Sequence, residues 1–161
     1  MQVFRFALLA VSILGLAACQ SGGAGTARPA PALPPSDEVP LQTLSPQRLA
    51  PGQCALVLWR RSAGSPRIFM AFSEPAVARV RIGGKELDLV RTDAAGERSF
   101  GHSPRQTYEG DGITLTVDLE IDPDRGLLAG AVVPAGILDF RREGGASVVL
   151  SVGGLIACQP Q

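Results

Sequence analysis

The sequence predicts an all-β domain, a small antiparallel β-sandwich or barrel of about seven to nine short strands. Apolar and polar residues alternate along several segments separated by turn sequences, and no window shows an apolar period of 3.6 residues over a useful length. The 161 residues include 19 glycines and 13 prolines. So many turn-forming residues favour short elements over long helices.

The first predicted strands are residues 54–60 and residues 67–72, joined by a turn at residues 62–66. The first strand is apolar on both faces, which is typical of a central strand in a sandwich or a barrel. A second turn at residues 73–75 leads into the next strand. The domain therefore begins with a strand that we expect to be buried.

Residues 78–89 predict a β-hairpin with Gly83-Gly84 as its two-residue loop. The favoured two-residue turn needs positive φ at both central positions, which glycine adopts without strain. This loop fixes the register, and the expected pairs are Ile82 with Lys85, Arg81 with Glu86, Val80 with Leu87, and Arg79 with Asp88. Opposite charges then face each other on one side and apolar residues on the other. We therefore assign these arginines a structural role rather than a binding role.

The predicted strands of the second half are, in order, residues 112–122, 127–133, 137–141 and 146–158. The first of them alternates over its whole length, which indicates a strand with one solvated face. The two middle strands are joined around Pro134-Ala135-Gly136. Gly153-Gly154 interrupts the last strand and predicts a β-bulge or a bend at a barrel corner.

The N-terminus has the pattern of a targeting segment. One positive charge precedes an apolar run over residues 6–18, which is shorter than the roughly 20 residues needed to span a bilayer core and has the length of a secretory signal. The run ends in Leu16-Ala17-Ala18-Cys19, which resembles the lipobox of bacterial lipoproteins. The resemblance covers residues 1–19 only. It implies a signal peptide over residues 1–18, cleavage before Cys19, and acyl chains on that cysteine.

This resemblance implies a lipid-anchored protein of the cell envelope, since two or more acyl chains hold a protein on a bilayer stably. Gln20 stands where an aspartate would retain a Gram-negative lipoprotein in the inner membrane, so we expect the outer membrane, with the domain facing the periplasm. Residues 19–51 contain seven of the 13 prolines and predict an anchor and tether. Residues 52–161 remain for the β domain, against whose edge Leu41, Leu44 and Leu49 can pack.

The three cysteines divide accordingly. With Cys19 as the lipid anchor, Cys54 and Cys158 remain, one in the first predicted strand and one at the end of the last. An oxidising compartment favours a disulfide between them that joins the first and last strands. A redox or nucleophilic cysteine and a pair of metal ligands are the alternatives, although the sequence contains no Cys-X-X-Cys motif.

Candidate catalytic residues are few. His102 is the single histidine, so any Ser-His-acid triad would have to use it. Asp118, Glu120 and Asp122 recur at every second position and share one strand face, where carboxylates could bind a metal ion or act as an acid and base pair. The same alternation is typical of a solvated strand face with basic residues opposite, which is the interpretation we favour.

The formal net charge is zero, which argues against a nucleic-acid partner. No cofactor motif is present, since the glycine pairs lack the spacing of phosphate loops and a following helix. The tryptophan and most other aromatic residues fall in strands, where we expect core packing.

The sequence therefore favours a non-enzymatic domain that binds an envelope protein or a glycan, or has a structural role. The alternative is a cell-wall or periplasmic hydrolase using His102 or the face of Asp118 and Glu120.

Overall fold

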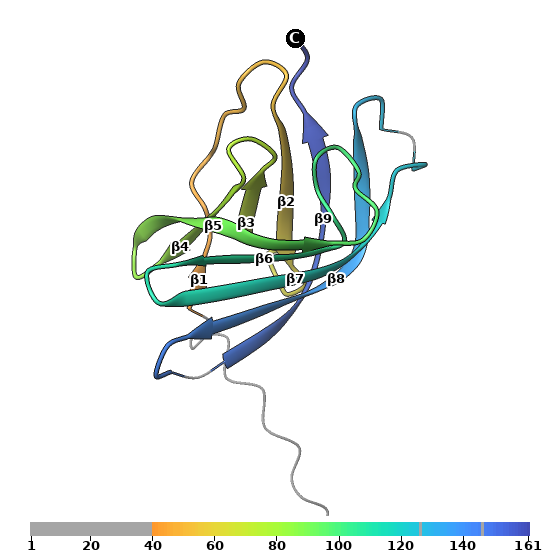
Figure 1. Cartoon of the computed structure of the whole chain (residues 1–161). Coiled ribbons are helices and arrows are strands. Elements are labelled where there is room, and N and C mark those ends of the chain that lie inside the picture. Colours follow the sequence, from red (N-terminus) through yellow and green to blue (C-terminus); the bar gives the residue numbers. More distant parts are fainter. Residues whose placement is uncertain (1–39, 126, 146) are drawn as a thin grey trace, which may run out of the picture. The chain divides into compact units, whose positions relative to one another are not determined.

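The computed structural model of the protein describes residues 40–125, 127–145 and 147–161 (Figure 1). The predicted signal peptide, Cys19 and most of the predicted tether lie outside these residues. All regular structure in the described residues is β-strand, as expected, and no helix long and apolar enough to cross a bilayer occurs among them. The strands are β1 (Leu41–Gln42), β2 (Cys54–Arg60), β3 (Arg67–Phe72), β4 (Val77–Ile82), β5 (Lys85–Ala95), β6 (Arg105–Gly110), β7 (Ile113–Asp122), β8 (Gly130–Arg142) and β9 (Ser147–Cys158).

The strands from β2 to β9 form a closed antiparallel barrel. Each pairs with the next along the chain, and β9 pairs back with β2 to close the cylinder. The short strand β1 pairs with Arg81 and Ile82 of β4, next to the residues of β4 that pair with β3. The structure therefore selects the barrel over the sandwich. The expected list of strands lacked β6, whose sequence alternates only weakly between apolar and polar residues.

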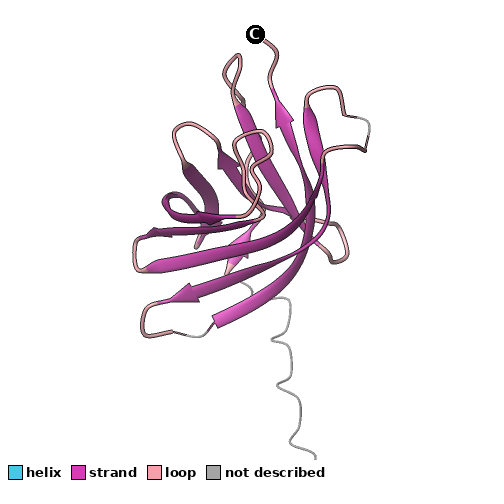
Figure 2. Cartoon of the chain, turned by 45° about the vertical axis from the view of Figure 1, so that its right-hand side comes forward, coloured by secondary structure: helices cyan, strands magenta, loops and turns pink. Residues whose placement is uncertain are grey.

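The strands β8 and β9 are the longest and curve strongly around the barrel (Figure 2). The expectation of two strands around Pro134 is wrong, because β8 runs continuously through it with a register shift between Val133 and Gly136. A β-bulge leaves a residue out of the ladder, so the missing N–H of proline costs no hydrogen bond there. Gly153-Gly154 lies directly opposite this bulge, so the predicted irregularity is at the right place but on the neighbouring strand.

Apolar side chains fill the barrel interior. They come from every barrel strand and include Leu56, Leu58, Leu89, Leu115, Leu138 and Ile156, all fully buried. Phe69 and Tyr108 meet edge to face with their ring centroids 5.6 Å apart. A second cluster lies on the outer side of β2 and β3, where Leu44 covers Ala55, Met70 and Phe72.

The packed structure begins before residue 52. Leu41 and Leu44 are buried, and Leu49 packs against the outer cluster. Leu44 and Leu49 therefore cover the outer face of β3, which explains why that strand is apolar on both faces, whereas Leu41 belongs to the interior cluster. This end of the predicted tether belongs to the folded domain, as the three leucines suggested.

The predicted hairpin and the predicted disulfide are both confirmed. All four expected pairs between β4 and β5 occur, and Gly83 and Gly84 have φ of 57° and 82°. Arg79 and Asp88 form a bidentate ion pair with two N–O distances of 2.7 Å. Glu86 instead accepts hydrogen bonds from the Ser45 backbone and the Gln47 side chain. Cys54 and Cys158 are bonded and stand directly opposite each other in β2 and β9, with their Cα atoms 4.0 Å apart.

Candidate functional site

His102 lies inside the domain, on the loop between β5 and β6. Its side chain is fully buried, and neither ring nitrogen has a hydrogen-bond partner among the described residues. Burial lowers the pKa of His102 to about 4, and the positive charges of Arg91 and Arg98 act in the same direction. These effects outweigh the nearby Cys54 backbone and Gln106 side chain, which favour the charged form. The imidazole is therefore neutral at pH 7 and has no acid or hydroxyl to form a triad with.

A buried polar network next to His102 holds this loop on the barrel. Gln106 is fully buried, receives a hydrogen bond of 2.8 Å from the Tyr108 hydroxyl and donates one of 2.9 Å to the Ser103 carbonyl. Arg91 donates to both Gln106 and the Gly101 carbonyl. Burial raises the pKa of Tyr108, so its hydroxyl remains a donor. The bonds to Gly101 and Ser103 tie β5 and β6 to the loop, and the other two join Arg91 and Tyr108 to Gln106, which indicates a structural role.

The three carboxylates of the predicted row do not converge on a metal. Asp118 forms an ion pair with Arg105, its register partner on β6, and Asp122 forms one with Arg125 at 3.1 Å. Glu120 is exposed. No group of three or more potential metal ligands occurs in the described part of the chain. Asp118 and Asp122 therefore have the basic neighbours that a solvated strand face predicts.

The most distinctive surface feature is a groove on the outer wall of the barrel, which we call the Trp59 groove. It has a volume of about 660 Å³, within the range typical of small-molecule sites. Its lining consists of a tryptophan, three arginines, small residues and apolar residues, namely Trp59, Arg60, Arg61, Ser65, Arg125, Val132, Val133, Pro134, Gly153 and Gly154. The expectation that the tryptophan belongs to the core is wrong.

The alternation of β2 explains the position of Trp59. Leu56 and Leu58 point into the barrel. The pairing with β3 shifts register between Leu58 and Trp59, but the pairing with β9 runs unbroken through both residues, so Trp59 belongs to the opposite face. Its partner on β9 is Gly153, which offers no side chain to cover the indole. Trp59 is consequently only half-buried and lines the groove.

The floor of the groove depends on the two glycines. A Cβ at Gly154 would lie 2.0 Å from the Val57 carbonyl oxygen, so only glycine allows β9 to approach β2 this closely. A Cβ at Gly153 would meet the Arg61 guanidinium at 3.1 Å and the Val133 carbonyl oxygen at 3.4 Å. Arg61 lies against this bare backbone and donates to the carbonyl oxygens of Val152 and Pro134. It therefore fastens the end of β2 to the bulge of β8.

The two remaining arginines leave the groove electropositive. Arg60 donates through Nε to the Ser62 hydroxyl at 2.9 Å, and no carboxylate pairs with it among the described residues. Arg125 is exposed, and its ion-pair partner within residues 40–125, 127–145 and 147–161 is Asp122. The lining itself contains three arginines and no carboxylate. Guanidinium groups bind carboxylates and phosphates through charge-assisted hydrogen bonds, so the groove is suited to an anion.

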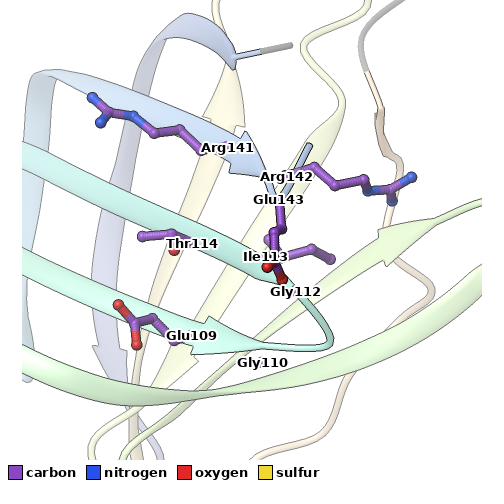
Figure 3. Close-up of a pocket in the computed structure, with 8 residues that line it drawn as sticks. All are labelled: Glu109, Gly110, Gly112, Ile113, Thr114, Arg141, Arg142 and Glu143. Carbon is purple, nitrogen blue, oxygen red and sulfur yellow. The ribbon is translucent and has the colours of Figure 1, made fainter. Parts of the chain in front are cut away.

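A second depression, of about 470 Å³, lies between the ends of two hairpins (Figure 3). Glu109, Glu143, Arg141 and Arg142 all line it, so its formal charges balance. The side chains of Arg141 and Arg142 point away from each other, and Arg141 is bound to Asp139 at 2.6 Å. This depression therefore presents neither a cluster of positive groups nor a cluster of negative groups to a ligand.

No family model, no curated protein and no solved structure matches this chain. The geometry itself therefore defines the class, a closed eight-stranded barrel with a filled interior and a basic groove on its outer wall. The sequence reasoning missed this groove. The signal was Trp59-Arg60-Arg61 at the end of one strand, with Gly153-Gly154 in the strand that pairs with it.

Proposed function

We propose that this protein is a lipid-anchored envelope lipoprotein whose barrel is a non-enzymatic binding module for an envelope protein or glycan. The observation that supports a binding role is the Trp59 groove, where an indole lies with three arginines, of which Arg60 has no carboxylate partner among the described residues. The barrel interior is filled by side chains. Recognition by this domain therefore belongs on its outer wall, unlike in barrels that enclose a ligand.

The proposed anchor rests on the lipobox at residues 16–19. Acylation of Cys19 would place the bilayer at the N-terminal end of the chain, with the outer membrane as the expected location and the periplasm as the compartment of the domain. The confirmed disulfide between Cys54 and Cys158 supports an oxidising compartment of this kind.

A hydrolase has less support from the structure. His102 is buried without a reacting partner, and Asp118 is held by Arg105. A general acid or base has to reach substrate, directly or through one water molecule. His102 is buried and does not reach the surface. Asp118 and Glu120 line one open depression of about 470 Å³, but Asp118 is paired with Arg105, so we retain the binding module as the proposed function.

Photo-cross-linking in native envelopes tests the binding role. A photoreactive amino acid replaces Ser65, which lines the groove, or Lys85, which is exposed at the tip of the β4–β5 hairpin and serves as the control position. We expect a discrete cross-linked species at residue 65 and none at residue 85. Equal labelling at both positions, or no species at residue 65, would overturn the groove as the recognition surface.

The anchor has its own test. The Cys19→Ala variant should leave the membrane fraction and appear in the soluble envelope fraction, whereas the wild-type chain stays with membranes. A variant that remains wholly with membranes refutes lipidation at Cys19. This result would leave the cross-linking experiment unaffected, because the groove lies in the folded domain.

A further inference from the structure

The Trp59 groove combines two kinds of recognition on one small surface. The indole of Trp59 is half-buried beside the backbone of Gly153 and Gly154, with the Arg61 guanidinium next to Gly153, and Val132 adds apolar surface to the lining. The aromatic and cation–π pairs found among the described residues, Phe69 with Tyr108 and Arg79 with Phe72, leave this ring unused. A half-exposed indole in a groove is suited to stacking against another flat, partly apolar surface.

The charges of the groove select an anion. Arg60 and Arg125 lie at this surface, whereas Arg61 is occupied by the carbonyl oxygens of Val152 and Pro134. Arg125 shares its charge with Asp122, and Arg60 has only a hydroxyl partner. Two guanidinium groups beside an aromatic platform can each donate hydrogen bonds to a carboxylate or phosphate of a stacked ligand.

The topology argues against a peptide in extended conformation. Peptides commonly bind to sheets by pairing with a free strand edge. The strands under this groove have no free edge, because β2 pairs with β3 and β9, and β9 pairs with β2 and β8. A ligand here has to be recognised by stacking and charge alone. A sugar ring offers a flat face of C–H groups for the indole and can bear an acidic substituent.

We propose that the Trp59 groove binds an anionic glycan, with a sugar ring stacked on Trp59 and its acidic group held by Arg60 and Arg125. This inference rests on the proposed binding function and specifies its ligand class. The volume of the groove, about 660 Å³, accommodates a short oligosaccharide rather than a single small anion.

Intrinsic fluorescence offers a direct test, since Trp59 is the single tryptophan of the chain. The full chain, in detergent, is titrated with a tetramer of glucuronic acid, with a neutral glucose tetramer and with a tetraglutamate peptide. We expect a saturable change in Trp59 emission with the uronic acid tetramer only, and weaker binding as ionic strength rises. A glucose tetramer that binds equally well overturns the role of charge. A peptide that binds equally well overturns the glycan.

Paired variants locate the site. Arg60→Ala with Arg125→Ala should weaken binding of the uronic acid tetramer about tenfold or more, because two charge-assisted contacts are lost. The matched control, Arg141→Ala with Arg142→Ala, removes the same charge from the other depression and should leave the affinity unchanged. Equal affinity of both double variants, with unchanged far-UV circular dichroism, overturns the assignment.

The two proposals can fail separately. Specific cross-links at residue 65 without any uronic acid binding would retain the binding module and reject the glycan. Absence of both signals would reject both proposals.

Discussion

The ladder between β2 and β9 and the ladder between β4 and β5 differ in how the chain specifies them. The β4–β5 ladder joins neighbours in sequence through the turn at Gly83-Gly84, and exposed charges line one of its faces. The β2–β9 ladder closes the barrel between cysteines separated by 104 positions, and a backbone approach at Gly154 and the Trp59 groove lie along it. Local sequence therefore determines the first ladder, whereas the second forms only when the whole barrel closes.

Removing the disulfide should give the largest effect on the closing ladder. The double variant Cys54→Ala, Cys158→Ala should lose up to ~4.7 kcal/mol of unfolding free energy, because the bridge closes a loop of about 100 residues in the unfolded chain. Urea unfolding of wild-type and variant protein gives the difference. An unchanged free energy would mean that the ladder alone closes the barrel and would remove this contrast with the hairpin.

The backbone approach at Gly154 should give the next largest effect. Gly154→Ala forces a Cβ against the Val57 carbonyl, which requires β2 and β9 to separate, and should cost about 3 kcal/mol. The neighbouring change Gly153→Ala puts its Cβ 3.1 Å from the Arg61 guanidinium and 3.4 Å from the Val133 carbonyl oxygen, so Arg61 has to shift from its carbonyl partners while the two backbones stay in place, and the change should cost less than Gly154→Ala. Urea unfolding of the two variants tests this order. Equal costs would show that the closing ladder tolerates side chains at either position.

His102 makes the stability of the domain depend on pH at the Cys54 end of the closing ladder. Its pKa is about 4 in the folded protein, against about 6.5 unfolded, so the unfolded chain binds the proton more readily between these values. The stability contributed by the neutral ring is complete above pH 6.5 and is lost as pH falls toward 4. Wild-type protein should lose about 2 kcal/mol between pH 7 and pH 5 from this group.

The variant His102→Gln should show a smaller loss over the same interval, since glutamine does not titrate. Denaturant unfolding at the two pH values measures both losses. Identical losses in wild type and variant would show that the buried ring does not control the acid sensitivity.

The same distinction between local and distant contacts determines what could be predicted. The hairpin register followed from two adjacent glycines, and all its pairs were correct. The pairing of β2 with β9 could be predicted only from Cys54 and Cys158, because the oxidising compartment implied by the lipobox favoured a disulfide between them. Barrel closure itself and the bulge that keeps β8 continuous through Pro134 depend on contacts between segments far apart in sequence.

The candidate site shows the same limit. The side of the barrel wall on which Trp59 lies follows from the alternation of Leu56 and Leu58 along β2, which the sequence shows. The exposure of its side chain, in contrast, depends on Gly153 in the opposing strand. The burial of His102 depends on the network of Arg91, Gln106 and Tyr108, which forms only in the folded barrel. Residue types therefore placed His102 correctly in a loop but could not show its burial, and they wrongly suggested a core tryptophan.

The smallest effect is expected in the hairpin itself. The Arg79–Asp88 pair is well aligned, but its side chains are 30% and 45% exposed, so water and salt screen the charges. Arg79→Ala should cost more than Asp88→Ala, because Arg79 also lies over the Phe72 ring at 5.7 Å and donates to Gln47. A double-mutant cycle separates these contributions and should give a coupling below about 1 kcal/mol that falls in 1 M salt. A coupling as large as the loss from the disulfide would mean that exposed charge pairs, rather than the turn and the apolar face, hold the hairpin in register.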